Sequence, residues 1–125
     1  MKRRKLTKIE RWEIYDKCHG YCAYCGSPLE YKDMQVDHVI PLYNGGKDEI
    51  DNILPACRSC NHYKSTLSLD GFRRMIDKIP STLYRDNATY RVGLRFGKIM
   101  ENRWKTVFYF ETLEEGQCIE STTEK

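Results

Sequence analysis

The sequence contains no apolar run that approaches the roughly 18 residues a membrane-spanning helix needs. No apolar signal segment follows the basic start, MKRRKLTKIE, so we read no secretion signal and expect a cytoplasmic protein. Internal repeats and low-complexity stretches are also missing. With 125 residues, 40% of them hydrophobic and 31% charged, the chain is expected to fold as one globular domain over residues 1–125.

The net charge of +3 is too small to exclude any class of binding partner, but the charges are unevenly distributed along the chain. Residues 1–20 hold seven basic and three acidic side chains, and residues 58–105 hold eleven and four. Residues 21–57, by contrast, have two basic and six acidic side chains, and residues 106–125 have one and five. An acidic centre between basic segments suits a metal site flanked by phosphate-binding surfaces, and solvated helix faces explain the charges equally well.

Four of the six cysteines form two C-x-x-C pairs, Cys22/Cys25 and Cys57/Cys60. In a reducing compartment such pairs favour metal binding over disulfides, and Zn²⁺ accepts four thiolates in a tetrahedron. The 31 residues between the pairs exceed what a minimal zinc ribbon needs, so we expect an inserted hairpin. A thioredoxin-like redox pair would need one such motif within a βαβ pattern. An iron–sulfur cluster uses the same ligands and is the main competitor to structural zinc.

The remaining patterns predict an α+β fold. Thr7 and Glu10 have capping-box spacing for a helix that ends near Gly20, and a polar knuckle follows. Residues 34–40 and 52–54 read as strands, and a helix is expected from about Arg58. Beyond the core, the predicted elements are a helix with Asp70 as its N-cap, a helix over 84–96, a strand over 106–110 and an acidic tail over 111–125.

A second set of polar residues lies between and after the cysteine pairs: Asp37, His38 and Asn61, with Asn52 nearby. Carboxylate and amide oxygens suit Mg²⁺ or Mn²⁺, and a neutral imidazole suits deprotonation of water near neutral pH. Lys64 follows Asn61 by one helical turn and is expected to face the same phosphate. Neighbouring strand residues point to opposite faces, so Asp37 and His38 converge only at a strand end or bend. Alone, they read as an ordinary surface or core pair.

The joint pattern resembles the HNH endonuclease superfamily, whose fold is the ββα-metal fold with a four-cysteine zinc frame in small phage and bacterial members. The matching text is DHVIP from Asp37, NGG from Asn44, DNIL from Asp51 and CRSCNHYK from Cys57. The resemblance covers residues 20–65 and is specific because the motifs occur together. Residues 66–110 would then be a helical and strand extension, although the likeness there is loose.

The resemblance implies a role for each matching residue. His38 would be the general base, and Asp37 and Asn61 would hold a catalytic Mg²⁺ or Mn²⁺ ion. Asn52 would fasten the loop and orient the site without touching metal. His62 points about 100° away from Asn61 on a helix and is the weaker candidate. Cys22, Cys25, Cys57 and Cys60 would hold structural Zn²⁺ and take no part in the chemistry.

DNA is the expected partner, and basic residues are expected to contact its phosphates rather than read its bases. The candidates are Arg58, Lys64, Arg73, Arg74, Arg91 and Arg95, with residues 1–6 as a basic arm. No base-reading module is recognisable, which predicts low intrinsic specificity or a bound targeting or packaging partner. The enzyme would either nick DNA or cut both strands as a homodimer. The alternative function is a zinc-ribbon module that binds DNA or a partner without cutting.

Overall fold

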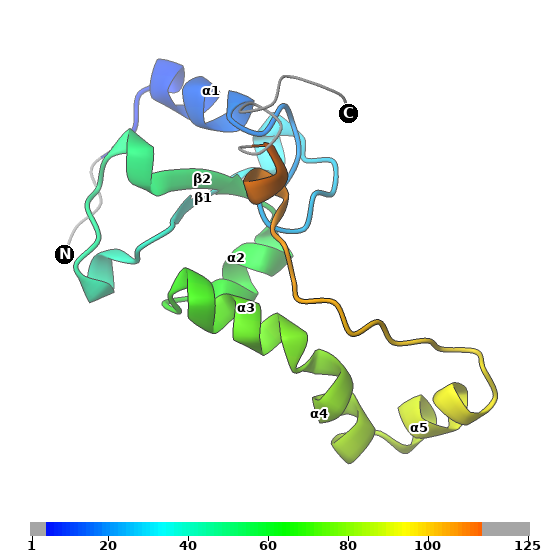
Figure 1. The fold of residues 1–125 in the computed structure, drawn as a ribbon. Helices are drawn as coiled ribbons and strands as arrows, with labels where there is room; N and C mark the ends of the chain where they lie inside the picture. The colour runs from blue at the N-terminus through cyan, green and yellow to red at the C-terminus, as the bar shows by residue number, and fades with distance from the viewer. Residues whose placement is uncertain (1–4, 114–125) are drawn as a thin grey trace.

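The computed structural model describes residues 5–113 (Figure 1). Most of the predicted basic arm and acidic tail therefore lies outside the described residues. A two-stranded sheet sits among five labelled helices, with short 3₁₀ turns at Tyr31–Asp33, Leu42–Asn44 and Ile50–Asn52. The elements are α1 (Lys8–Asp16), β1 (Gln35–His38), β2 (Ile53–Ala56), α2 (Arg58–Lys64), α3 (Leu69–Asp77), α4 (Ile79–Asp86) and α5 (Ala88–Arg95).

The centre of the fold is an antiparallel hairpin followed at once by a helix. In the β1–β2 register, Asp37 lies opposite Leu54 and His38 opposite Ile53. Helix α2 contacts β1, and α1 contacts β2. This β–β–α unit confirms the predicted α+β class and places the end of β1 beside α2.

Helix α1 starts as the sequence predicts. The Thr7 hydroxyl accepts a hydrogen bond from the Glu10 N–H at 3.1 Å, and the Glu10 carboxylate accepts one from the Thr7 N–H at 3.0 Å. The helix buries Ile14 against Ile53 of β2 and Met34, which form one of two apolar clusters. Capping and burial together fix α1 on the hairpin.

The second apolar cluster joins the cysteine knuckle to α3 and to the end of the described chain. Tyr24, between the first two cysteines, meets the rings of Phe72 and Phe108 edge-on, with centroids 5.3 and 5.2 Å away. Phe72 and Phe108 are stacked at 5.2 Å and are almost completely buried. Three aromatic side chains of this size, each burying about 150–250 Å², hold α3 against the knuckle.

The strand predicted over residues 106–110 is wrong: residues 101–108 have no regular structure and residues 109–113 are helical. The backbone groups of Thr106 bond to side chains, whereas the N–H groups of Tyr109 and Phe110 donate to the backbone carbonyls of Tyr24 and Ala23 at 3.2 and 2.8 Å. Asp77 accepts from the Thr106 N–H at 2.9 Å, and Arg73 donates to the Thr106 carbonyl at 2.7 Å. The β-branched and aromatic residues of TVFYF favour a strand by composition, but here they bury Phe108 without forming one.

The helix predicted over residues 84–96 is two helices. The chain turns at Asn87, whose backbone is extended (φ −132°) and whose side chain caps α5 by accepting from the Tyr90 N–H at 3.0 Å. Helix α3 begins after Ser68, which caps it in place of the predicted Asp70. Helices α4 and α5 extend away from the hairpin, and the chain returns from α5 towards it (Figure 1). Among the described residues, no helix is both long and apolar enough to span a membrane.

Candidate active site

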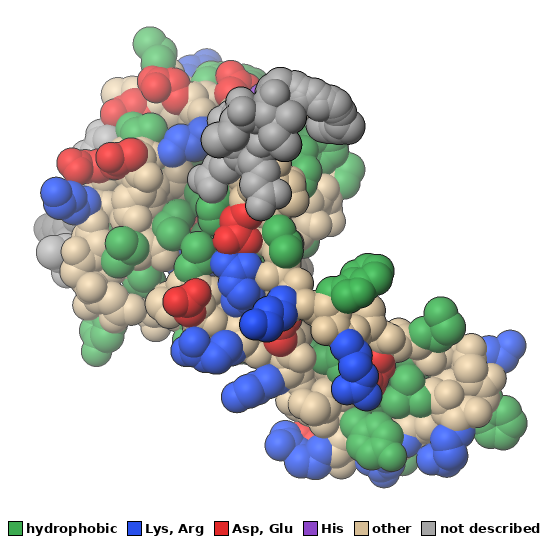
Figure 2. All heavy atoms as spheres, viewed as in Figure 1, with side chains coloured by type: hydrophobic (Ala, Val, Ile, Leu, Met, Phe, Trp, Pro, Cys, Tyr) green, Lys and Arg blue, Asp and Glu red, His purple; other side chains and the backbone are tan. Residues whose placement is uncertain are grey.

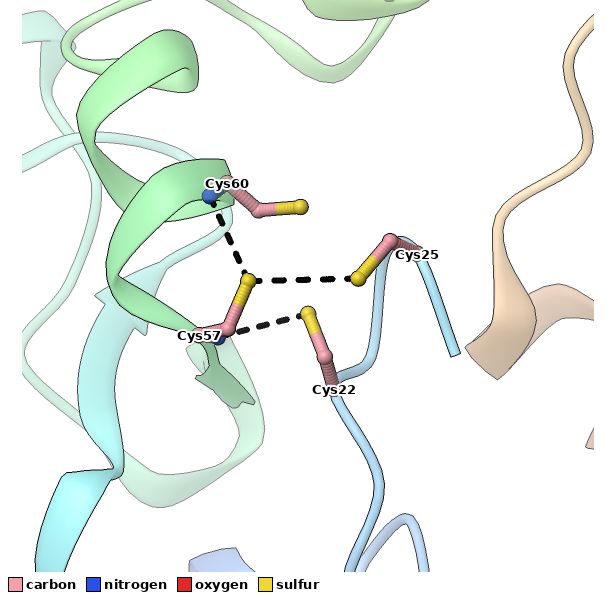
Figure 3. Close-up of side chains that lie close together, drawn as sticks. All are labelled: Cys22, Cys25, Cys57 and Cys60. Atoms are coloured by element: carbon pink, nitrogen blue, oxygen red, sulfur yellow. Dashed lines mark hydrogen bonds between the residues drawn. The ribbon is translucent and has the colours of Figure 1, made fainter. Parts of the chain in front are cut away.

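The four paired cysteines meet at one point, as predicted. Cys22 and Cys25 come from the loop after α1, and Cys57 and Cys60 from the start of α2, with their sulfur atoms turned towards one another (Figure 3). All four sulfurs lie within 4.8 Å of each other. Sulfurs around a tetrahedral zinc with Zn–S bonds of about 2.3 Å are about 3.8 Å apart. The Cys25 and Cys57 sulfurs, at 3.9 Å, already have that spacing.

Backbone N–H groups point at the sulfurs in the manner that stabilises thiolates. The Cys22 sulfur accepts from the N–H groups of Tyr24 at 3.4 Å and Cys57 at 3.3 Å, and the Cys57 sulfur accepts from Cys60 at 3.4 Å. The pKa of Cys22 is lowered, chiefly by a hydrogen bond from the Cys60 thiol. The donor set therefore fits Zn²⁺. Cys18 is buried outside this cluster, and burial raises its pKa to about 11.

The predicted reaction centre is a pocket of about 430 Å³ where the end of β1 faces α2. Asp37, His38 and Asn61 all line it. His38 is the last residue of β1, and the chain bends through Pro41 directly afterwards, so two consecutive residues reach one pocket as the prediction required. The other lining residues are Pro41, Leu42, Tyr43, His62, Ser65 and Thr66.

Asp37 is buried between two donors. Its Oδ2 accepts a hydrogen bond from the Tyr24 hydroxyl at 2.5 Å and lies 3.3 Å from the Lys64 ammonium. Burial raises the pKa of Asp37, while Tyr24 and Lys64 act in the opposite direction. Within the described residues no hydrogen bond reaches Oδ1. That oxygen and the amide oxygen of Asn61 are the hard donors available to a divalent ion in this pocket.

His38 is held through one ring nitrogen. Its Nε2 lies 2.8 Å from Asp48 Oδ1, and because a carboxylate only accepts, Nε2 carries the proton. Its Nδ1 is then the lone-pair nitrogen, and it is buried without a hydrogen-bond partner within the described part of the chain. An imidazole with one nitrogen fixed by a carboxylate and the other unpaired is arranged as a general base.

The loop between the strands is fastened by Asn52. Its side-chain oxygen accepts from the Ile40 N–H at 3.0 Å, and its amide donates to the carbonyls of Ile40 at 3.0 Å and Lys47 at 2.8 Å. Gly46 closes the same loop, because a Cβ there would lie 1.8 Å from the Ile40 carbonyl oxygen. Asn52 and Gly46 thus set the bend that follows His38.

Two of the predicted DNA contacts need correction. Lys64 is completely buried and donates to the His38 carbonyl at 3.0 Å as well as pairing with Asp37, so it faces no bound strand. Arg73 forms two hydrogen bonds with the Glu111 carboxylate, at 2.8 and 2.7 Å, which lower the pKa of Glu111. Arg58, Arg74 and Arg95 are exposed, whereas Arg91 is half-buried and donates to the Tyr84 and Arg85 carbonyls.

Sequence reasoning missed Tyr24 and Asp48. Tyr24 lies between the two cysteines of the first C-x-x-C pair, a position that by itself indicates no role beyond spacing the zinc ligands. Asp48 lies in an acidic segment after Gly45 and Gly46, and its sequence position suggests an ordinary polar loop residue. Tyr24 gave no signal beyond its position. For Asp48 the signal was only general: a general-base histidine usually has an orienting partner, but Asp33 and Asp37 are closer to His38 in the sequence than Asp48, Glu49 and Asp51 are.

Replacing Lys64 by methionine is expected to destabilise the zinc-loaded protein by about 3–5 kcal/mol, because Asp37 would be left as an uncompensated buried charge. Urea unfolding at neutral pH, without added Mg²⁺, measures the change. The exposed Lys32→Met is the control and should stay within about 0.5 kcal/mol of the parent. A loss at Lys64 no larger than at Lys32 would show that the Asp37–Lys64 pair is not needed for stability.

Known proteins match this part of the chain. Residues 22–66 match the family described as HNH endonuclease. The CRISPR-associated endonuclease Cas9 of Corynebacterium diphtheriae is 31% identical over 55 residues, which is 43% of this chain and 5% of that protein. The type IV methyl-directed restriction enzyme EcoKMcrA of Escherichia coli K12 is 36% identical over 64 residues, 44% of this chain and 23% of that enzyme.

A solved structure has the same fold. The crystal structure of the type II-C Cas9 enzyme from Actinomyces naeslundii superposes with a TM-score of 0.51 at 24% identity, over 60% of this chain and 9% of that one. The chain therefore corresponds to a small part of each of these larger proteins.

Proposed function

We propose that this protein is a metal-dependent endonuclease that hydrolyses phosphodiester bonds in DNA, because residues 22–66 match the HNH endonuclease family. The observation that supports it best is the pocket itself. Asp37, His38 and Asn61 line one cavity, and the buried Nδ1 of the histidine has no hydrogen-bond partner among the residues that the structure describes. A protein that only binds DNA has no need of this combination of groups.

In the proposed mechanism His38 is the general base. Asp48 holds the Nε2 proton, so the lone pair on Nδ1 accepts a proton from the attacking water. When the imidazole becomes positively charged, the same carboxylate stabilises it. The histidine is also held from the other side of the strand, since Lys64 donates to its carbonyl. The ring is thus oriented before substrate binds.

Asp37 and Asn61 would hold the catalytic Mg²⁺ or Mn²⁺. When bound, this ion supplies charge stabilisation at the scissile phosphate and the leaving oxygen. The buried carboxylate fits that use, because burial raises its pKa and a bound cation would offset the cost of its charge. Tyr24 and Lys64 fix the carboxylate through Oδ2 and leave Oδ1 for the ion.

A titration of zinc-loaded protein with Mn²⁺ tests this assignment apart from cleavage. Asp37→Asn is expected to weaken Mn²⁺ binding about 10-fold or more, since loss of even an outer-sphere partner costs about 10–100-fold. Isothermal calorimetry or the Mn²⁺ spin-resonance signal measures the affinity. The exposed Asp33→Asn serves as the matched control and should bind as the parent does.

The alternative function is a zinc-ribbon module that binds DNA or a partner protein without cutting. It is supported by the cysteine cluster alone, which needs no second metal. The Mn²⁺ titration separates the two functions. A parent protein that holds one zinc and takes up no Mn²⁺ would favour the binding module.

A further inference from the structure

Residues 78–105, which comprise helices α4 and α5 and the chain that follows them, form an extension that we call the arm. It is distinct from the basic arm predicted at residues 1–6. Residues 78–105 carry seven basic and two acidic side chains. Large apolar side chains are also exposed here, including Phe96 at 76%, Met100 at 87% and Trp104 at 82%. In the face shown in Figure 2, Lys and Arg side chains alternate with hydrophobic ones over the arm.

A groove of about 720 Å³ runs between α4 and the returning chain. Trp104 and Tyr84 contribute the aromatic surface, and Tyr84 is 54% exposed. Basic side chains lie beside them: Arg103 and Lys105 line the groove, and within the described residues neither has an ion-pair partner. The third basic residue, Arg85, pairs with its neighbour Asp86.

Both acidic groups that line the groove are engaged elsewhere. Asp77 accepts from the Thr106 N–H at 2.9 Å and from its hydroxyl at 2.5 Å. Glu101 accepts from the Tyr90 hydroxyl at 2.6 Å. These hydrogen bonds anchor the walls of the groove to α3 and α5. Both carboxylates keep their negative charge, so the groove itself is lined by three basic and two acidic side chains, and the excess of positive charge comes from the whole of residues 78–105.

The returning chain is held closely against α5. The Gly93 carbonyl accepts from the N–H groups of Lys98 at 2.9 Å and Ile99 at 3.2 Å. A Cβ at Gly93 would lie 2.6 Å from Cδ1 of Ile99, so a larger residue there would require the Ile99 side chain to shift. The segment that carries Trp104 is consequently tied to the helices at both ends, by α5 at its start and by α3 through Asp77 at Thr106.

We propose that this groove binds unpaired DNA, a proposal that rests on the endonuclease function. Positive charge matches the phosphate backbone, and exposed aromatic rings stack on bases. In a duplex the base faces are covered by their neighbours, so a Trp and a Tyr in an open groove favour a single strand. The arm would hold a single DNA strand through contacts with its phosphates and by stacking on its bases, without reading the base sequence.

The test uses the full-length, zinc-loaded His38→Ala protein without Mg²⁺, so that no DNA is cut. A further Trp12→Phe change leaves Trp104 as the sole tryptophan. A 12-nucleotide oligo(dT) is expected to quench the Trp104 fluorescence saturably, and added salt should weaken the binding. Trp104→Ala is expected to lower the affinity about 10–100-fold, by anisotropy of labelled oligo(dT), since stacking supplies that much per base. Trp12→Phe is the control and should bind as its parent does.

Three results would overturn the proposal. Absence of quenching in the folded protein is one. A second is equal binding of oligo(dT) and a 12-base-pair duplex with no effect of Trp104→Ala, which would indicate phosphate contacts alone. A third is self-association on gel filtration that Trp104→Ala abolishes, with no oligo(dT) binding, which would show that a second copy covers the aromatic face. Because the protein used cannot cut DNA, failure here leaves the nuclease proposal intact, and failure of cleavage leaves this result intact.

Discussion

Cys57→Ser is expected to leave most of the chain unfolded at 25 °C, and removal of zinc from the parent should do the same. Structural zinc supplies on the order of 10–16 kcal/mol of apparent binding free energy in small zinc domains. A domain of this size has a total stability of only about 5–15 kcal/mol. The free energy lost with the ion is therefore about as large as the total stability of the domain, and the remaining interactions are not expected to keep it folded.

The position of the knuckle makes this dependence specific to the fold. Cys57 packs against both apolar clusters, and Cys22 is part of the one that holds Tyr24 and Phe72. Within the described residues, the other contacts between the loop after α1 and the start of α2 are one backbone hydrogen bond, from the Ala23 N–H to the Pro55 carbonyl at 2.9 Å, and the packing of Cys22 and Tyr24 against Ala56. Both the core and the pocket are therefore expected to be lost together.

Circular dichroism and zinc content, measured before and after chelation, test this expectation. Ser59→Ala is the matched control, because Ser59 lies within the same C-x-x-C pair and is exposed. It should retain one zinc per chain and the parent's melting curve. A metal-free protein that keeps its helical signal and cooperative melting would contradict a folding role for the cluster. A coloured, iron-containing preparation would point to an iron–sulfur centre.

His38→Ala is expected to lower the rate of DNA cleavage by about 10²–10⁴-fold, the usual contribution of a positioned general base. The loss should appear under single-turnover conditions with saturating DNA and Mg²⁺. Binding of DNA should change little, because His38 is 5% exposed and its role is to accept a proton. The melting temperature, measured in parallel, shows whether the variant keeps its fold.

His62→Ala provides the comparison. His62 lines the same pocket but is exposed, and among residues 5–113 no carboxylate is paired with its ring. Its replacement should leave the cleavage rate within a few-fold of the parent. A reversed result, with His62 essential and His38 dispensable, would mean that the base has been assigned to the wrong ring.

The parts of the fold predicted correctly are those with local or strongly spaced signals. The two C-x-x-C pairs predict the metal cluster, because a two-residue gap presents two sulfurs from one turn. Thr7 and Glu10 predict the start of α1 from a local capping rule. Asp37 and His38 were expected to converge only if the chain bends, and the bend follows His38 directly.

The errors concern residues whose environment depends on distant parts of the chain. Lys64 has correct helical spacing from Asn61, but spacing cannot show that Asp37 lies on its inner face and buries it. The TVFYF segment has a strand composition, yet strands also need a free edge to pair with. The backbone groups of Thr106 instead meet Asp77 and Arg73 from α3, about 30 residues earlier, and those of Tyr109 and Phe110 meet Tyr24 and Ala23. Tyr24 and Asp48 were missed for the same reason.

Nicking of supercoiled plasmid by the zinc-loaded parent protein, with and without added Mg²⁺ or Mn²⁺, tests the central claim most directly. We expect open-circular DNA to form only when one of these ions is present. Plasmid that stays supercoiled with every ion, although the protein is folded and carries one zinc, would contradict the endonuclease assignment and leave a zinc-braced binding module.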